Sequence, residues 1–438
     1  MNISFGVITR HFTTMEPIDQ FLDNAEKFGH DIYSVVVAYA EECDESVVKA
    51  LESRINVQLV RINETDEMCQ TLHEIGMTRH SIDTLLNCPE LPQKGLVPYG
   101  KNRNNVIMKA MLTGSDVLVF IDTDVYPELL VETDGGVVSR EIDFIGEHLK
   151  YLELEKVMIT TSDYSGYYII PPMSFEGMEK LYRGLQKENV CDFLVNSDQH
   201  KGFVPARYGQ DRVPFRTNKI LGGNVAIKLS IFEKVLPFFS SVYDVGGHSV
   251  LTRGEDTLLG LELERSKDLI CMDIDLRIFH NTFSHYPTVP DVVNDQNIKD
   301  RFYRACLGWI GRNPFLNWMN GVNLDKIHEL QRKALVEGAP AVAKYLNDDR
   351  FLVLPEALDL SYNRVEDMVQ EYHRFARSWK EFIAKYKNWR YRFENTHYEP
   401  LSIGRVRQRH LHDEFGQGAE FSGTHGESGV SGTQGNDL

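Results

Sequence analysis

The feature that most constrains the fold is a regular alternation of strand-like and helix-like segments at the start of the chain. Residues 3–9, 32–40 and 55–63 are rich in β-branched side chains and predict strands. Residues 15–29 and 45–54 carry apolar side chains at helical spacing and predict helices. A strand–helix–strand–helix–strand order predicts a parallel sheet with crossover helices, so we expect an α/β protein.

A further strand is predicted over residues 117–121, and two aspartates, Asp122 and Asp124, follow it directly. In open α/β sheets, ligands bind at the carboxyl ends of the strands. Two carboxylates at such an end can reach a divalent cation, and Mg²⁺ or Mn²⁺ takes oxygen ligands from carboxylates and substrate phosphates. From this stretch alone, the alternative is a loop of solvated aspartates, one of which caps a turn.

Two further segments suit an anionic or a sugar ligand. Lys101 and Arg103 lie in a predicted loop that opens a helix, where the cations and the helix N-terminus both favour phosphate. Gly222 and Gly223 permit close backbone approach or a positive φ, and Asn224 can offer its amide to a sugar hydroxyl. Taken alone, the first segment also fits an exposed basic helix start, and the second a simple turn.

Two later segments supply candidate acid–base and metal-ligating groups. Glu255 and Asp256 open a leucine-rich helix, where a carboxylate can serve as a general base or accept a hydrogen bond from a sugar hydroxyl. The helix macrodipole alone also explains acidic residues at such a position. A strand-like stretch over residues 273–287 delivers His280, with His285 nearby, and a histidine there is either structural or part of a metal shell.

In this order, the five segments resemble a glycosyltransferase of the GT-A fold. The similarity is to the family-2-like group, which includes the polypeptide GalNAc-transferase and chondroitin-polymerase type domains. That group has a G-K-x-R-N loop before a strand ending D-x-D, then G-G-N, G-E-D and a late metal-binding histidine. The matching stretches here are Gly100–Asn104, Asp122–Asp124, Gly222–Asn224, Gly254–Asp256 and His280, and the resemblance covers roughly residues 1–290. It implies a mixed sheet flanked by helices, with a C-terminal helical appendage.

The resemblance also implies roles at the metal and the reacting groups. Asp124 would bind Mn²⁺ or Mg²⁺ at the two phosphates of a nucleotide-sugar, and Asp122 would contact the ribose or the donor sugar. His280 would be the third protein ligand of the metal, with His285 as the second choice. Asp256 would be the catalytic base of an inverting enzyme, whereas a retaining relative would use Asp256 and Glu255 for binding only.

The remaining matching residues would bind the donor. By the same resemblance, Thr9 and Arg10 would line the nucleotide pocket. Lys101 and Arg103 would face the nucleotide or the diphosphate. Gly223 and Asn224 would lie at the donor sugar or the acceptor. The aspartate-rich element that reads the nucleobase in many relatives is missing after the second strand, so Glu41, Glu42 or Asp44 would have to replace it. The nucleotide therefore stays open, with UDP- and GDP-sugars as the first expectation. The acceptor, a carbohydrate, a lipid-linked or a small molecule, also stays open.

Three rival functions remain. A nucleotidyltransferase would share the sheet and the metal, but the glycine-rich loop expected after its first strand is missing. A haloacid-dehalogenase-type phosphatase has D-x-D-x-[TV], and Tyr126 stands where Thr or Val belongs. A non-catalytic protein that binds a sugar-nucleotide would instead work through its C-terminal helices.

The chain is expected to divide into a glycosyltransferase domain (residues 1–321), a helical region (322–395) and a linker with a disordered Gly/Ser-rich tail (396–438). The helical region could pack on the first domain or join two copies of the chain. A net charge of -17 argues against nucleic acid as a partner. Six scattered cysteines without a CxxC pair predict reduced thiols. With neither a signal peptide nor a long apolar run, a cytoplasmic protein is expected, with peripheral membrane association left open.

Overall fold

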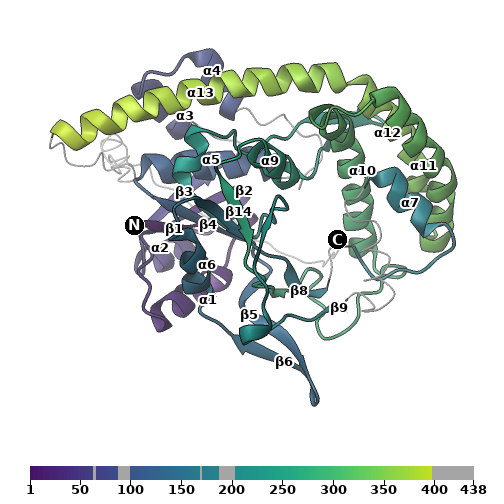
Figure 1. The fold of residues 1–438 in the computed structure, drawn as a ribbon, viewed down its shortest axis with the longest axis horizontal. Helices are drawn as coiled ribbons and strands as arrows, with labels where there is room; N and C mark the ends of the chain where they lie inside the picture. The colour runs from purple at the N-terminus through teal and green to yellow at the C-terminus, as the bar shows by residue number, and fades with distance from the viewer. Residues whose placement is uncertain (63–65, 87–98, 168–169, 187–202, 397–438) are drawn as a thin grey trace, which may run out of the picture. The chain divides into compact units, whose positions relative to one another are not determined.

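The computed structural model describes residues 1–62, 66–86, 99–167, 170–186 and 203–396. These residues belong to one compact unit, Met1–Thr396, and the remaining residues lie outside the description. Figure 1 shows a strongly twisted sheet covered by helices, with more helices following it along the chain. The predicted fold class, a mixed α/β sheet flanked by helices with a C-terminal helical appendage, is confirmed.

Eight strands form the large sheet in the described part of the chain. Their spatial order is β10 (Phe215–Thr217), β14 (Ile270–Asp273), β7 (Val157–Thr161), β11 (Asn224–Lys228), β4 (Val117–Ile121), β1 (Ile3–Phe12), β2 (Ser34–Cys43) and β3 (Val57–Arg61). The first four strands along the chain are mutually parallel, as predicted, whereas β11 runs against both β4 and β7. All five residues of β4 are buried, because helices cover both faces of this central strand.

The predicted crossover helices are present, with α1 at Glu16–Lys27 and α2 at Glu45–Glu52. Between β3 and Tyr99, the described residues form two further helices, α3 (Asp66–Glu74) and α4 (Arg79–Leu86). The next helix, α5 (Tyr99–Leu112), begins before Lys101, so the expected loop around Lys101 and Arg103 is wrong and both residues are helical.

A second sheet of five strands stands beside the end of β4. Its spatial order is β6 (Gly136–Glu141), β5 (Val125–Thr133), β15 (Ile278–His280), β8 (Tyr164–Tyr167) and β9 (Phe203–Val204). Residues 136–141 form a strand of the β5–β6 hairpin, which precedes α6 (Phe144–Leu152). The antiparallel pairing of β15 with β5 places His280 opposite Val125, the residue after Asp124.

The other elements of the first 290 residues are short. They are α7 (Met178–Leu185), α9 (Glu255–Glu264), the hairpin of β12 (Val242–Val245) and β13 (His248–Leu251), and the 3-10 helices η1 (Gly209–Asp211) and η2 (Leu229–Glu233). Asn224 begins β11, and the 3-10 turn η2 follows that strand directly.

Four long helices and one 3-10 turn follow, α10 (Gln296–Met319), α11 (Leu324–Leu346), η3 (Asp349–Val353), α12 (Leu354–Asn363) and α13 (Val365–Thr396). On α13, the Glu381 carboxylate accepts hydrogen bonds from the Thr78 N–H (2.7 Å) and the Ser81 hydroxyl (2.6 Å) at the start of α4. The indole of Trp379 donates to the carbonyl of Phe232 (3.0 Å). The helical region thus packs on the sheet unit, and the boundary expected at residue 321 stays a prediction.

Two other expectations concern the chain as a whole. The disordered tail predicted within residues 396–438 lies, from residue 397 on, outside the described residues. Cys43, Cys69, Cys271 and Cys306 are free thiols, as predicted for these four. Within the part of the chain that the structure describes, no helix has both the length and the apolar character to cross a membrane.

Candidate active site

A cavity of about 1920 Å³ opens beside the carboxyl ends of β1, β4 and β7. Nine of the eleven residues predicted for the site line it, namely Thr9, Arg10, Arg103, Asp122, Asp124, Gly223, Glu255, Asp256 and His280. These residues come from separate parts of the chain, so the fold brings together most of the set expected from short motifs. Lys101 and Asn224 do not belong to the lining.

The centre of this set is the pair of Asp124 and His280. The Nε2 atom of His280 lies 3.2 Å from a carboxylate oxygen of Asp124. In an octahedral Mg²⁺ site with bonds of about 2.1 Å, neighbouring ligand atoms lie about 3.0 Å apart. The two side chains could therefore act as neighbouring ligands of one cation with little movement.

Thr282 sets the orientation of the His280 ring. The Thr282 hydroxyl donates its only proton to the carbonyl of Tyr167 (3.1 Å), so it accepts from Nδ1–H of His280 (3.0 Å). In neutral His280 the lone pair of Nε2 consequently faces the carboxylate of Asp124. Two lone pairs repel each other unless a cation or a proton lies between them, so this arrangement fits either a metal ion or a proton on Nε2.

The predicted three-ligand set is not formed. Among the described residues, no three His, Cys, Asp or Glu side chains gather in a way that could hold a metal ion. His285, the second choice, instead pairs with Asp295 (3.4 Å), the residue that caps α10. The protein supplies two candidate ligands, and substrate oxygens and water would have to complete the shell.

Arg301 of α10 is an additional charged neighbour of Asp124 that the sequence did not indicate. Its Nη2 atom lies 3.9 Å from Asp124, and its guanidinium lies over the ring of Phe283, 5.5 Å from the centroid. Burial acts to raise the pKa of Asp124, but His280 and Arg301 outweigh it, and the pKa lies below its usual value. Asp124 is therefore held in its charged, metal-binding form.

Asp122 has different surroundings from Asp124. A Cβ atom on Gly223 would lie 2.1 Å from a carboxylate oxygen of Asp122 and 2.9 Å from the Tyr164 hydroxyl. The Gly223 N–H donates to this hydroxyl (3.0 Å), and Gly223 is needed for close approach rather than for a positive φ. The pKa of Asp122 is raised, mainly because the carboxyl is buried. The positive charge of Arg103 lowers this pKa and the negative charge of Asp124 raises it, but neither outweighs burial.

Arg103 forms an ion pair with Glu255 and is buried within the protein. Arg103 is 5% exposed, donates to the carbonyl of Gly222 (2.6 Å) and lies 3.4 Å from Glu255 through Nε. Its guanidinium also reaches Asp122 at 4.0 Å and lies over the ring of Phe120. The expected contact of Arg103 with a phosphate is thus replaced by contacts within the protein, and the residue positions Asp122 and Glu255.

Asp256 lies in the first turn of α9, next to Glu255. The helix starts after Gly254, which has φ +94° and caps its N-terminus. Asp256 accepts the N–H of Thr257 through Oδ1 (2.8 Å) and lines the cavity. The positive end of the helix dipole favours its charged form.

Of the residues expected to contact the nucleotide, those at the end of β1 line the cavity and those at or just after the end of β2 do not. Thr9 and Arg10 line the cavity at the end of β1, and Arg10 pairs with Glu41 (2.9 Å). Glu42 lies 3.6 Å from His11, and Asp44 caps α2 through the N–H of Ser46. None of these three acidic residues lines the cavity, so their expected role in reading the nucleobase has no support.

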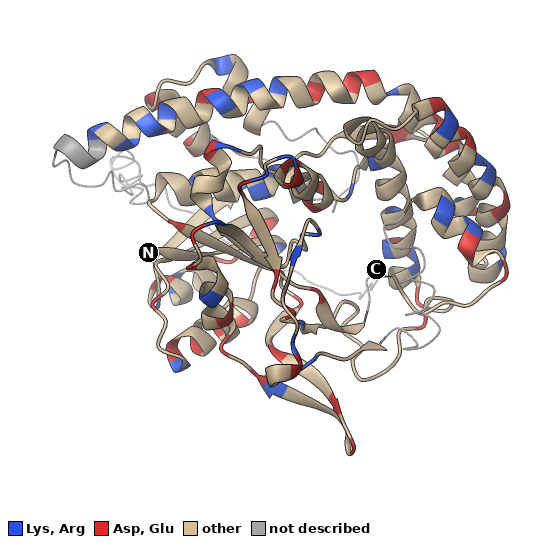
Figure 2. Ribbon diagram, viewed as in Figure 1, with Lys and Arg blue, Asp and Glu red and all other residues tan. Residues whose placement is uncertain are grey.

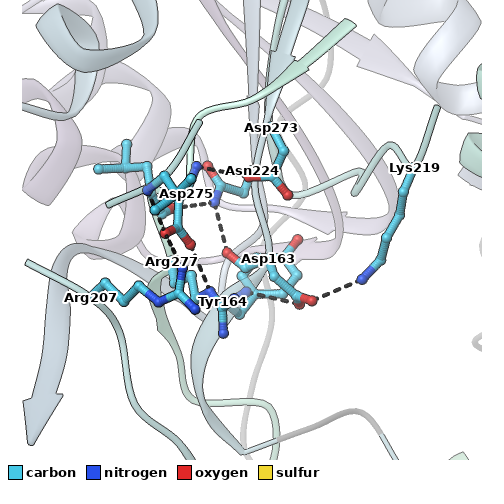
Figure 3. Close-up of polar contacts among 10 residues, drawn as sticks. Asp163, Tyr164, Arg207, Lys219, Asn224, Asp273, Asp275 and Arg277 are labelled. Atoms are coloured by element: carbon cyan, nitrogen blue, oxygen red, sulfur yellow. Dashed lines mark hydrogen bonds and ion pairs between the residues drawn. The ribbon is translucent and has the colours of Figure 1, made fainter. Parts of the chain in front are cut away.

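Asn224 links neighbouring segments at the sheet edge and does not face the cavity. It is fully buried, and its amide donates to the carbonyls of Leu276 (2.8 Å) and Asp163 (3.1 Å). Figure 3 shows this amide beside a cluster of ion pairs at the same edge. The expected contact of Asn224 with a sugar is therefore wrong.

The sequence did not single out that cluster of ion pairs (Figure 3). Asp163 follows β7 and pairs with Lys219 (2.8 Å), while Asp275 accepts from Arg277 (3.0 Å) and Arg207 (3.4 Å). An apolar or β-branched stretch that leads into an aspartate, as in "TTSD" and "CMDID", was the available signal. Three aromatic side chains that could stack on a sugar, Tyr164, Tyr167 and Trp309, also line the cavity.

No known family model and no curated protein matches the chain. Among solved structures, it is similar to glucosyl-3-phosphoglycerate synthase from Mycobacterium tuberculosis in complex with Mn²⁺, UDP and phosphoglyceric acid. The identity is 12% and the TM-score 0.35, over 74% of this chain and 79% of that one. The same enzyme with Mg²⁺ and UDP matches at 14% identity and a TM-score of 0.35, over 74% and 80%. The narrower resemblance to the polypeptide GalNAc-transferase and chondroitin-polymerase group stays a prediction.

Proposed function

We propose that this chain is a metal-dependent glycosyltransferase that moves a sugar from a nucleotide-diphosphate donor to an acceptor hydroxyl. The observation that carries the proposal is the pair of Asp124 and His280, whose facing ligand atoms lie 3.2 Å apart at the end of a buried central strand. The same cavity holds Arg301 beside Asp124 and the carboxylate of Asp256. These are the groups that a leaving diphosphate and an attacking hydroxyl require.

Asp124 and His280 would hold Mn²⁺ or Mg²⁺. When bound, such an ion stabilises the negative charge that develops on the diphosphate as the glycosidic bond breaks. Arg301 is half-exposed and adds a fixed positive charge beside the same position. Asp122, which lies 4.0 Å from Arg103 and packs closely against Gly223, would accept a hydrogen bond from the ribose or the donor sugar.

Asp256 would act as the general base of an inverting reaction. The bond between the anomeric carbon and the phosphate oxygen breaks with its electron pair leaving on that oxygen, while the acceptor oxygen bonds to the anomeric carbon. The proton of the acceptor hydroxyl passes to the carboxylate of Asp256. Glu255 lies 3.4 Å from Arg103, and its role in this proposal is to position that arginine.

Thermal unfolding in the presence of nucleotides tests the donor site. The full chain is heated with UDP, GDP or ADP and the corresponding nucleotide-sugars, each with and without Mn²⁺. We expect one nucleotide series to raise Tm in a Mn²⁺-dependent manner, followed by Mn²⁺-dependent release of the nucleoside diphosphate from its sugar derivative. If no nucleotide shifts Tm and none of the sugar derivatives is turned over, the proposal fails.

A further inference from the structure

The cavity wall carries more basic than acidic residues, although the protein as a whole is acidic. The chain carries a net charge of -17, yet ten basic and six acidic residues are found among the described residues of the cavity wall. The basic residues are Arg10, Arg103, Arg207, Lys219, Arg253, Arg277, Arg301, Arg304, Arg312 and Arg350, and the acidic ones are Asp122, Asp124, Asp163, Glu255, Asp256 and Asp273. A concave surface with an excess of positive charge in an acidic protein attracts anions.

Most of these cations already have partners. A carboxylate oxygen lies within 4.0 Å of seven, Arg10, Arg103, Arg207, Lys219, Arg277, Arg301 and Arg350. Arg312 is buried and lies 3.3 Å from the Thr257 hydroxyl. This leaves Arg253 and Arg304, for which the structure shows no ion pair with any described residue.

Arg253, which precedes α9, lies against the part of α10 that carries Arg304. The side chain of Arg253 lies on Gly308, where a Cβ atom would meet its Cγ at 2.6 Å, and its N–H donates to the Gly308 carbonyl (3.0 Å). Arg304 is one helical turn before Gly308. Asp300, one turn before Arg304, is bound by Arg350 (2.6 Å), and the charge of Arg304 acts on it from beyond ion-pair distance. Figure 2 shows basic residues along α10.

We infer that Arg253 and Arg304 bind an anionic group, a phosphate or a carboxylate, of the sugar acceptor. This inference rests on the proposed function, in which Asp256 activates the acceptor hydroxyl. Arg253 is three residues before Asp256 in the segment that starts α9, so an acceptor placed at this base has Arg253 close to it. The donor diphosphate has its own charge partners around Asp124 and Arg301. Guanidinium groups bind phosphates and carboxylates through paired charge-assisted hydrogen bonds.

The first test measures anion binding directly. Inorganic phosphate and acetate are titrated into the full chain by calorimetry at constant ionic strength, with the variants Arg253→Gln, Arg304→Gln and Arg301→Gln. Arg377→Gln is the matched control, because Arg377 is exposed on α13 and is not part of the cavity wall. We expect at least one anion to bind, and its Kd to rise about tenfold in Arg253→Gln and in Arg304→Gln but not in the control.

Three results would overturn the inference: no binding of either anion, an unchanged Kd in both variants, or a loss of binding in Arg301→Gln alone. The last result would assign the anion to the donor side. Because Arg304 is exposed, Arg304→Gln is expected to fold even where Arg253→Gln does not.

The second test asks whether the anion belongs to the acceptor. Release of nucleoside diphosphate is measured with glucose, glucose 6-phosphate and glucuronate as acceptors, and the two anions distinguish a phosphate from a carboxylate. We expect an anionic acceptor to exceed glucose, and KM for it to rise about tenfold in Arg304→Gln. Equal rates with glucose contradict the inference and leave the proposed function intact. If the anion binds in an arginine-dependent manner but no donor is turned over, the anion site is supported and the proposed function fails.

Discussion

His280 and Asp124 meet at the edge between two sheets, with Nε2 of the histidine 3.2 Å from the carboxylate. The contact follows from strand register, because β15 pairs with β5 so that His280 lies opposite Val125. The Asn281 N–H also donates to the carbonyl of Asp124 (2.9 Å). The backbone therefore fixes the distance between two side chains that lie far apart in the sequence.

Replacing either member of this pair should abolish metal-dependent turnover. Asp124→Asn removes the charged ligand without changing its shape, and His280→Ala removes the nitrogen ligand. We expect each to lower donor turnover by about 100-fold or more, the order found when a group that stabilises developing charge is lost. His285→Ala is the control, since His285 pairs with Asp295 at the start of α10. Equal losses in all three variants would show a general effect on folding.

The hydroxyl of Thr282 should control metal affinity without being a ligand. Thr282→Val keeps the shape of the side chain but removes the acceptor that fixes Nδ1–H of His280. Loss of such a partner typically costs about 10- to 100-fold in metal affinity. Equilibrium binding of Mn²⁺ measures the change. Thr133→Val in the β5–β6 hairpin loses one hydrogen bond away from the cavity and should bind Mn²⁺ like the parent chain.

The parts of this site that follow from local sequence were predictable. An apolar pentapeptide followed by Asp122 and Asp124 predicts a buried strand with carboxylates at its end, because burial selects apolar residues. A strand-like stretch ending in His280 similarly predicted that a histidine would reach the sheet edge. Both inferences use only neighbours in the chain.

The contacts of Arg301 and Arg103 could not be predicted from neighbours in the chain. Arg301 reaches Asp124 because α10 packs against the cavity, which depends on contacts between distant helices. Arg103 was expected to face a phosphate, but the backbone at Gly222 comes so close that a Cβ there would lie 2.2 Å from Nη2. Such close approaches depend on tertiary packing, and the spacing of residues in a motif does not determine them.

A methyl group at Gly223 should disturb Asp122 specifically. In Gly223→Ala, the new Cβ would lie 2.1 Å from the Asp122 carboxylate, so the aspartate must move. We expect a loss of about 1–3 kcal/mol in the free energy of unfolding, typical of overpacking, together with weaker binding of the donor. Denaturant unfolding and nucleotide-sugar titration measure the two effects. Gly135→Ala is the control, because its nearest neighbour would be 3.9 Å away. Unchanged donor binding in Gly223→Ala would argue against a role for Asp122.

The buried His148 should make the protein less stable in mild acid. Burial lowers the pKa of His148 to about 3, against about 6.5 in an unfolded chain. Below pH 6.5 the unfolded chain takes up a proton that the folded protein does not, so stability falls as the pH drops toward 3. From pH 7 to pH 5 this contributes a loss of about 2 kcal/mol. His148→Gln should lack this part of the loss in denaturant titrations at the two pH values. An identical pH dependence in both proteins would contradict the prediction.

Replacing Asp256 and replacing Glu255, the adjacent carboxylates of α9, should have different effects, one on catalysis and the other on stability. Asp256→Asn keeps the hydrogen bond from Thr257 but removes the base, so we expect kcat for transfer to fall by about 10²- to 10⁴-fold with donor binding retained. Glu255→Gln weakens the contact with the buried Arg103 and should instead lower the free energy of unfolding, by about 2 kcal/mol. Steady-state kinetics and denaturant unfolding of both variants distinguish the roles. If Asp256→Asn keeps near-full transfer, Asp256 is not the base, and the retaining alternative, in which the pair only binds, gains support.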